Sequence, residues 1–252
     1  RLEIGQATAF KNYYTREGCT VDRYLRPTRM LDFHHRSIRE LVKERRWENE
    51  NEFAKIQKIY NFVRDEIQFG YNTDDAIPAS EVLKDGYGQC NTKGTLLMAL
   101  LRAVGIPCRI HGFTIDKKLQ KGAMTGLIYA LAPRNIVHSW VEVQYQGRWY
   151  NIEGFILDRP YLNKLQAKFS DCKAGFCGYG VATDNFQNPP IDWNGNDTYI
   201  QKEGINRDFG VFDSPDAFFE KYGQPISPLK KWVFRNFARK MMNRNVEKIR
   251  SG

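Results

Sequence analysis

The sequence has little of what marks membrane-spanning, disulfide-rich or zinc-binding proteins. None of its 252 residues falls in an unbroken apolar run approaching the eighteen or so that a transmembrane helix needs. Five cysteines are an odd number in a long chain, which argues against a disulfide scaffold. No pair of Cys or His residues is matched by a second pair at zinc-site spacing, and no internal repeat is evident. We therefore expect a globular protein that needs no metal or other cofactor.

Basic charge is also scarce outside one segment. The net charge is +9, and residues 230–250 alone carry +7. Nucleic-acid binding is not expected, because the body of the chain is close to neutral. Residues 228–250 alternate cations with apolar side chains, which is typical of a basic amphipathic helix. Such a helix contacts an anionic membrane or a protein partner, or else docks on its own domain with a solvated basic face.

The cysteines do not determine whether the protein is cytoplasmic or exported. Cys172 and Cys177 form a local disulfide if the protein is exported, or are two separate thiols. A cytoplasmic location is slightly favoured, with export as the alternative if a signal sequence has been removed from the segment before Arg1. Nothing in the pattern indicates an oligomeric state.

Helical periodicity dominates the first hundred residues. Apolar residues at three- and four-residue spacing predict a helix over residues 51–69, with Asn51 as its N-cap. A short helix is expected over residues 79–84. A third, strongly apolar helix begins near Cys90 and ends at Gly105, a natural C-terminal cap.

The period then changes to two, which indicates strands. Strands are expected over residues 109–113, 137–145 and 148–153, the last two joined by a two-residue hairpin at Gln146 and Gly147. An insertion covers residues 116–135. Residues rich in Gly, Asn, Asp and Pro predict irregular structure from about 160 to 210, with helices starting after Ser214 and Ser227. The order of these elements divides the chain into a core over residues 1–160 and a loop-rich extension over residues 161–252.

Three side chains in this order suggest an activated thiol. Cys90 starts a helix, where unpaired N–H groups and the helix dipole favour a thiolate. His138 lies on a strand and can serve as general base and acid, and Glu153 lies on the next strand of the hairpin, where a carboxylate can orient the imidazole. In a simple register the hairpin pairs His138 and Glu153, or nearly so, with Cβ atoms ~5 Å apart.

These segments resemble the transglutaminase-like superfamily over about residues 28–160. The resemblance is carried by Gly-Gln-Cys90 and the helix after it, by His138-Ser-Trp-Val-Glu-Val, and by Gly-Arg-Trp-Tyr-Asn-Ile-Glu153. It implies a papain-like α+β fold, in which the cysteine-bearing helix packs on an antiparallel sheet. It also implies thiol acyl chemistry on amides through a Cys-His-acid triad that requires no metal.

One departure concerns the acid. The family usually has aspartate where this chain has Glu153, and the longer side chain moves the carboxylate outward. Asn151, two residues earlier, is the alternative orienting residue, because an amide serves in papain-like enzymes. The backbone N–H of Cys90 is expected to stabilise an oxyanion, and a second donor is not identifiable from the sequence.

The resulting expectation is a cysteine hydrolase or acyltransferase. Cys90 forms a thioester with a peptide, protein or other amide substrate, and hydrolysis by a protease or amidase is favoured over cross-linking. The alternative is an inactive transglutaminase-like module that binds a membrane or a partner through its basic tail. Substrate and acyl acceptor are not encoded in any motif of the chain.

Overall fold

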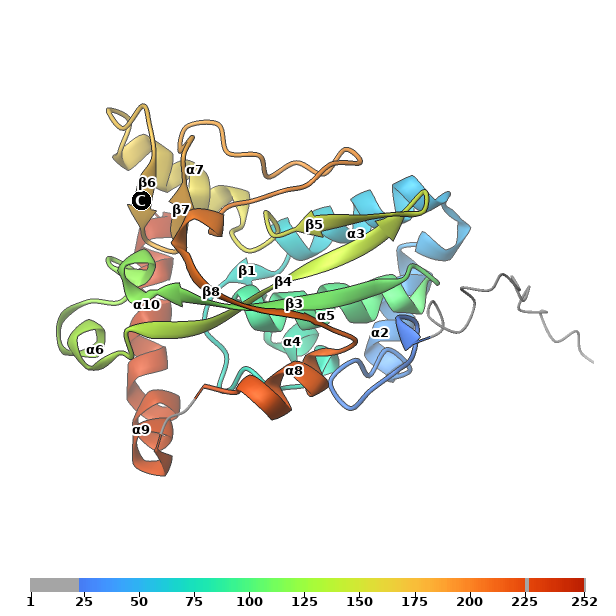
Figure 1. Ribbon diagram of the computed structural model, residues 1–252, viewed down its shortest axis with the longest axis horizontal. Coiled ribbons are helices and arrows are strands. Elements are labelled where there is room, and N and C mark those ends of the chain that lie inside the picture. Colours follow the sequence, from blue (N-terminus) through green and yellow to red (C-terminus); the bar gives the residue numbers. More distant parts are fainter. Residues whose placement is uncertain (1–22, 225–226, 252) are drawn as a thin grey trace, which may run out of the picture.

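A computed structural model describes residues 23–224 and 227–251 (Figure 1). Cys19 lies outside the described residues. The longer helices are α2 (Arg36–Glu44), α3 (Glu52–Asp65), α4 (Ala79–Asp85), α5 (Cys90–Ala103), α6 (Gly126–Leu131), α7 (Arg159–Lys168), α8 (Pro215–Tyr222), α9 (Pro228–Val233) and α10 (Arg239–Ser251). The strands are β1 (Gln68–Phe69), β2 (Tyr87–Gly88), β3 (Cys108–Asp116), β4 (Asn135–Tyr145), β5 (Arg148–Ile152), β6 (Phe176–Gly178), β7 (Val181–Thr183) and β8 (Ile205–Phe212). Four short turns, η1 (Trp47–Asn49), η2 (Lys117–Gln120), η3 (Lys202–Gly204) and η4 (Phe234–Ala238), complete the described part.

The central element is an antiparallel sheet in the order β5-β4-β3-β8. β4 and β5 form the predicted hairpin, in which Tyr145 pairs with Arg148. Gln146 and Gly147 both have positive φ, as a type I′ turn requires, and this turn matches the twist of its flanking strands.

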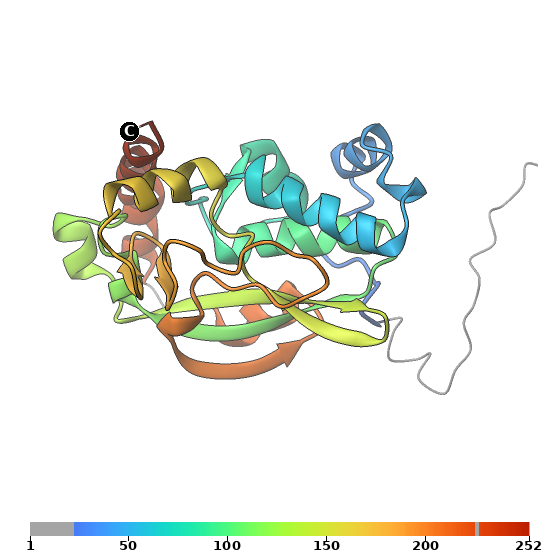
Figure 2. The same ribbon diagram turned by 90° about the horizontal axis from the view of Figure 1, so that it is seen from above.

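α5 is the buried helix that packs on this sheet. Every residue from Cys90 to Arg102 is buried, and Gly94 lies close enough to Val141 of β4 that an added Cβ would be in van der Waals contact with it. α3 and α4 lie beside α5, so helices form a layer along one face of the sheet (Figure 2). The predicted fold class, an α+β fold with a cysteine-bearing helix on an antiparallel sheet, is confirmed.

The start of α3 follows from capping. Asn51 accepts a 2.9 Å hydrogen bond from the Ala54 N–H and so starts α3 as predicted. α3 ends at Asp65, earlier than the periodicity suggested. Residues 68–69 instead form β1, whose parallel pairing with β2 sets the backbone directly before Cys90.

The expectation of irregular structure between residues 160 and 210 was wrong at both ends. Asp158 caps α7 by accepting from the Tyr161 N–H, and Pro160 occupies the first turn, where proline is tolerated. β8 is a largely exposed edge strand, so its sequence lacks the apolar alternation of a half-buried strand. Because β8 pairs with β3, the C-terminal extension completes the sheet of the core.

Candidate active site

Cys90 is the first residue of α5. Gln89 is the N-cap, and its side chain accepts a 2.7 Å hydrogen bond from the Asn91 N–H. Since N–H groups in the first helical turn lack intrahelical partners, this turn offers donors to a developing oxyanion. The Cys90 residue is only 7% exposed.

Gln89 also holds the thiol. Its Oε1 lies 2.9 Å from Cys90 Sγ, and its Nε2 donates a 2.6 Å hydrogen bond to Asp75. Burial, and after it the charge of Asp74, raise the pKa of Asp75 to about 6. The sequence placed Gln89 beside Cys90 but did not indicate where its side chain points, and Asp75 was not anticipated.

His138 and Glu153 are fully buried and in contact. His138 Nε2 lies 2.8 Å from Glu153 Oε1. The other carboxylate oxygen accepts hydrogen bonds of 2.8 Å and 2.9 Å from the backbone N–H groups of Ile200 and Gln201. Glu153 therefore reaches the imidazole despite its extra methylene, and the C-terminal extension fixes its position.

The register of the hairpin differs from the simplest expectation. β5 ends at Ile152, which pairs with Val141, so His138 and Glu153 are not directly opposite. Glu153 lies just beyond the end of the strand, in a diagonal position relative to His138. A longer side chain than aspartate suits that position, because diagonal neighbours are further apart than direct pairs.

Cys90 lies close enough to His138 to act on the pKa of its imidazole. The imidazole Nδ1, the nitrogen that does not contact Glu153, is buried and has no hydrogen-bond partner among the described residues. Burial lowers the pKa of His138, but the charge of Cys90 and the contacts with Cys90 and Glu153 outweigh it and raise that pKa to about 10. The arrangement favours the imidazolium form of His138.

Asn151 is engaged elsewhere. Its side-chain nitrogen lies 3.0 Å from the Tyr199 hydroxyl and 3.4 Å from Asp197. It pairs with Glu142 across the hairpin, one position further along β4 than Val141. In the structure the carboxylate of Glu153, rather than the amide of Asn151, lies against His138.

Asn91 is a site residue that the sequence did not reveal. Its Nδ2 donates to the Val137 carbonyl at 3.2 Å, and its Oδ1 accepts from the Ser139 hydroxyl at 2.9 Å. Both partners are neighbours of His138 along β4. Asn91 thereby links the first turn of α5 to β4 at the residues before and after His138. No motif in the sequence predicts these contacts.

The remaining histidines and cysteines lie apart from this cluster. His111 contacts Glu142 and Asp208 at 2.8 Å each. Burial lowers the pKa of His111, but these carboxylate contacts outweigh burial and leave the pKa raised. Cys172 and Cys177 are free thiols, so the disulfide alternative is not realised. Within residues 23–224 and 227–251, no group of three or more His, Cys, Asp or Glu side chains is arranged to hold a metal ion.

A sequence model of the transglutaminase-like superfamily matches residues 39–154, which include Cys90, His138 and Glu153. Residues 39–154 are a transglutaminase-like superfamily domain. The resemblance inferred from the three motifs is thereby confirmed.

The chain is similar to parts of longer proteins. The chain is 28% identical over 163 residues to the uncharacterized protein YebA of Bacillus subtilis strain 168, covering 60% of this chain and 21% of YebA. Among solved structures, a candidate cysteine protease from Cytophaga hutchinsonii matches with 14% identity and a TM-score of 0.46, over 78% of this chain and 48% of that one. Red sea bream transglutaminase matches with 13% identity and a TM-score of 0.27, over 87% and 32%. The chain thus spans about a fifth of YebA and less than half of either solved structure.

Proposed function

We propose that the protein is a cysteine-dependent amide hydrolase, with Cys90 as nucleophile, His138 as general acid and base, and Glu153 as the residue that orients the imidazole. The observation that supports this most strongly is the arrangement around His138. Glu153 lies 2.8 Å from Nε2, Nδ1 is buried without a hydrogen-bond partner among the described residues, and Cys90 is close enough to raise the pKa of the imidazole. A carboxylate that fixes the tautomer and stabilises the imidazolium is what thiol activation requires.

The reaction has two halves. The Cys90 thiolate attacks the carbonyl carbon of a peptide, protein or other amide, and the N–H groups at the start of α5 stabilise the oxyanion. The C–N bond breaks as the His138 imidazolium gives its proton to the leaving amine, which leaves a thioester on Cys90. His138 then takes a proton from water, whose oxygen attacks the thioester, and a carboxylic acid leaves as the thiolate returns. A primary amine in place of water would give acyl transfer.

Burial of the thiol favours a second candidate function, an inactive binding module. Cys90 is 7% exposed and its Sγ is in contact with Gln89, so a carbonyl reaches the sulfur only after neighbouring side chains move. A protein in which Cys90 never becomes accessible to a substrate would keep this fold but could not attack an amide.

Alkylation against pH separates the two functions before a substrate is known. An activated thiolate should let iodoacetamide label Cys90 rapidly well below the ~8.5 at which a free thiol titrates. His138→Ala should abolish this advantage. Cys177 is an internal control in the same digest, because burial and the nearby Asp116 raise the pKa of its thiol. Labelling of Cys90 that is absent, or that is unaffected by His138→Ala, would leave the binding module as the better account.

Turnover is then measured with a fluorescently labelled protein substrate, with and without a primary amine. Release of labelled fragments that Cys90→Ala abolishes supports hydrolysis. Incorporation of the amine without cleavage would instead assign acyl transfer. A thioester on Cys90, detected by intact mass after acid quenching, is expected in either case.

A further inference from the structure

The C-terminal arm, which we define as residues 228–251, has two sides of different character. One side docks on the domain. Met242 and Val246 are buried, and Asn243 bonds both the N–H and the carbonyl of Tyr71 at 2.8 Å and 3.1 Å. Arg250 pairs with the buried carboxylate of Asp158 at 2.8 Å. The arm is therefore held in place before any partner arrives.

The other side of the arm exposes large apolar side chains. We call this set the apolar stripe: Leu229, Trp232, Val233, Phe237 and Met241. Their exposed fractions run from 42% for Val233 to 71% for Leu229. Trp232 and Phe237 pack edge to face at 5.6 Å and so form an aromatic pair on the surface.

A π-helical turn keeps the apolar stripe on one side. Four of its members are spaced four residues apart, and in a helix of 3.6 residues per turn each such step advances by about 40°. The turn η4 is a π-helix, whose wider i→i+5 turn takes up this advance. Phe237 and Met241, after the start of η4, are exposed like Leu229 and Val233 before it, while Met242 and Val246 are buried.

α6 adds apolar surface at the same end of the molecule. Leu127 is 72% exposed and Leu131 is 64% exposed, and they are four residues apart on one helix. Asn245 of the arm bonds the Ala123 carbonyl and the Thr125 hydroxyl directly before α6. Both views place α6 beside α10, at the end of the molecule opposite α2 (Figures 1 and 2).

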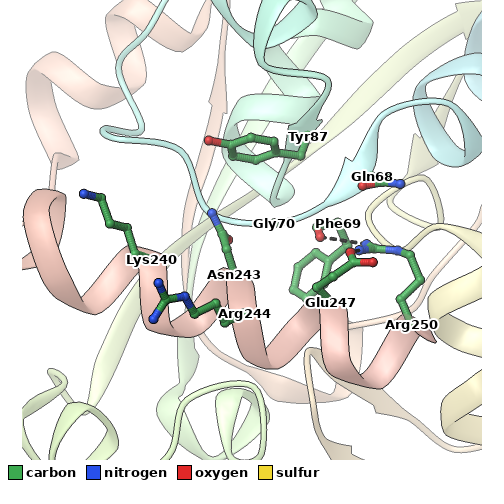
Figure 3. Close-up of a pocket in the computed structure, with 9 residues that line it drawn as sticks. All are labelled: Gln68, Phe69, Gly70, Tyr87, Lys240, Asn243, Arg244, Glu247 and Arg250. Carbon is green, nitrogen blue, oxygen red and sulfur yellow. Dashed lines mark hydrogen bonds and ion pairs between the residues drawn. The ribbon is translucent and has the colours of Figure 1, made fainter. Parts of the chain in front are cut away.

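Cations without partners accompany the stripe. Lys230, Lys240, Arg244 and Lys248 are exposed and make no ion pair with any residue that the structure describes. Lys240 and Arg244 also line a pocket of about 410 Å³ between α10 and the β1–β2 strands (Figure 3). The acid in this pocket, Glu247, is already paired with Arg250 at 2.7 Å. The pocket therefore offers positive charge to an anion.

We propose that the apolar stripe and α6 dock on the surface of an anionic lipid bilayer, with Lys240 and Arg244 contacting phosphate headgroups. Apolar side chains with Trp among them insert at the boundary between headgroups and acyl chains, and adjacent Lys and Arg residues gain from anionic lipids. A second copy of this chain fits the face less well, because two arms that each carry +7 between residues 230 and 250 would repel. This surface is independent of the amide chemistry proposed for Cys90.

Vesicle co-sedimentation tests the proposal on the full chain. Vesicles of phosphatidylcholine alone are compared with an equal mixture of phosphatidylcholine and phosphatidylglycerol. We expect binding to the mixture that is at least ~10-fold tighter and weakens with salt, since each cation near an anionic surface contributes ~1 kcal/mol. Trp232→Ala/Phe237→Ala should weaken binding to the mixture, and so should Lys240→Glu/Arg244→Glu by ~10-fold or more.

A matched pair on α2 is the control. Arg39 and Lys43 are also exposed and four residues apart, at the opposite end of the molecule, so Arg39→Glu/Lys43→Glu should bind like the wild type. An equal loss of vesicle binding in Arg39→Glu/Lys43→Glu and in Lys240→Glu/Arg244→Glu would overturn the proposed site, because binding would then depend only on the net charge of the protein. No binding to either vesicle overturns the proposal. So does sedimentation as a dimer that Trp232→Ala/Phe237→Ala dissociates, because a second copy would then cover the face.

Discussion

Ser139 donates its hydroxyl proton to Asn91 Oδ1 at 2.9 Å, which links β4 to the first turn of α5. Asn91 follows Cys90 and Ser139 follows His138, so the hydrogen bond joins the immediate neighbours of the nucleophile and the base. The Asn91 contact to the Val137 carbonyl completes the link on the other side of His138. A buried amide next to Cys90 therefore links the helix that carries the thiol to the strand that carries the imidazole.

Removing this link should misplace the pair without removing either member. Asn91→Ala is expected to slow Cys90 alkylation below pH 8 and to destabilise the fold by ~1–3 kcal/mol, because the Ser139 hydroxyl and the Val137 carbonyl lose a buried partner. Ser139→Ala should cost about 1 kcal/mol. A double-mutant cycle on unfolding free energy should give a coupling of roughly 0.5–1.5 kcal/mol between the two residues.

Thr95→Val is the control for this prediction. The Thr95 hydroxyl donates to the Asn91 carbonyl at 3.0 Å, a hydrogen bond that lies entirely within α5. It should alter stability but leave the rate of Cys90 alkylation at low pH unchanged. Similar loss of reactivity in Thr95→Val would show that α5 responds to any buried change, and the positioning role of Asn91 would be abandoned.

Much of this site follows from local sequence, and the rest depends on tertiary contacts. Cys90 at a helix start, His138 on a strand and the turn at Gln146 and Gly147 were predictable, because capping, alternation and turn chemistry act within a few residues. The pairing of Glu153 with His138 was predictable only approximately, since β5 stops at Ile152 and the contact is diagonal.

The backbone donors that hold the Glu153 carboxylate could not be predicted from the sequence. The N–H groups of Ile200 and Gln201 that hold Glu153 belong to a segment almost fifty residues further along, and any residue but proline supplies an N–H. β8 was missed for a related reason. An exposed edge strand is specified by its pairing with β3 rather than by its own apolar pattern.

The charge of Glu153 should determine the alkaline limit of activity. His138 must be protonated to release the leaving amine, and its pKa is raised to about 10, so kcat/KM should fall as the pH passes that value. Glu153→Gln keeps the size of the side chain but removes a negative charge that raises the pKa of His138. The alkaline limit should then move to lower pH, and kcat/KM should fall by about 10²-fold or more.

Glu142→Gln provides a matched control for that experiment. Glu142 is another buried carboxylate on the same sheet that contacts a histidine, His111, at 2.8 Å. Its replacement should leave the alkaline limit in place. An alkaline limit that is the same in wild type and Glu153→Gln would mean that the proton of the leaving amine does not come from His138.

Lys93 should make stability depend on pH in the direction opposite to His138. Its side chain is fully buried one turn after Cys90, and its Nζ donates to the carbonyls of Arg64 and Ile156 at 3.1 Å and 3.0 Å. Burial lowers the pKa of Lys93 to about 7, against the opposing charges of Asp158 and Asp65. The unfolded chain, with an ordinary lysine pKa of about 10.4, binds the proton more tightly throughout the window between these values.

Stability from Lys93 should therefore rise with pH from about 7 to about 10 and be lowest below pH 7, where the folded protein must bury the charge. For His138 the folded pKa is raised, so its contribution to stability is present below about pH 6.5 and is lost as the pH approaches 10.

The variant Lys93→Met removes only the contribution of Lys93 to the pH dependence of stability. The free energy of unfolding of Lys93→Met minus that of wild type should therefore fall as the pH rises, by up to ~1.4 kcal/mol per pH unit. Denaturant unfolding of both proteins between pH 7 and pH 10 measures this difference, and the His138 contribution cancels in it. Lys164→Met, at an exposed position on α7, should give a flat difference. Parallel curves for Lys93→Met and wild type would show that Lys93 stays protonated in the fold, held by its two carbonyls and the nearby aspartates.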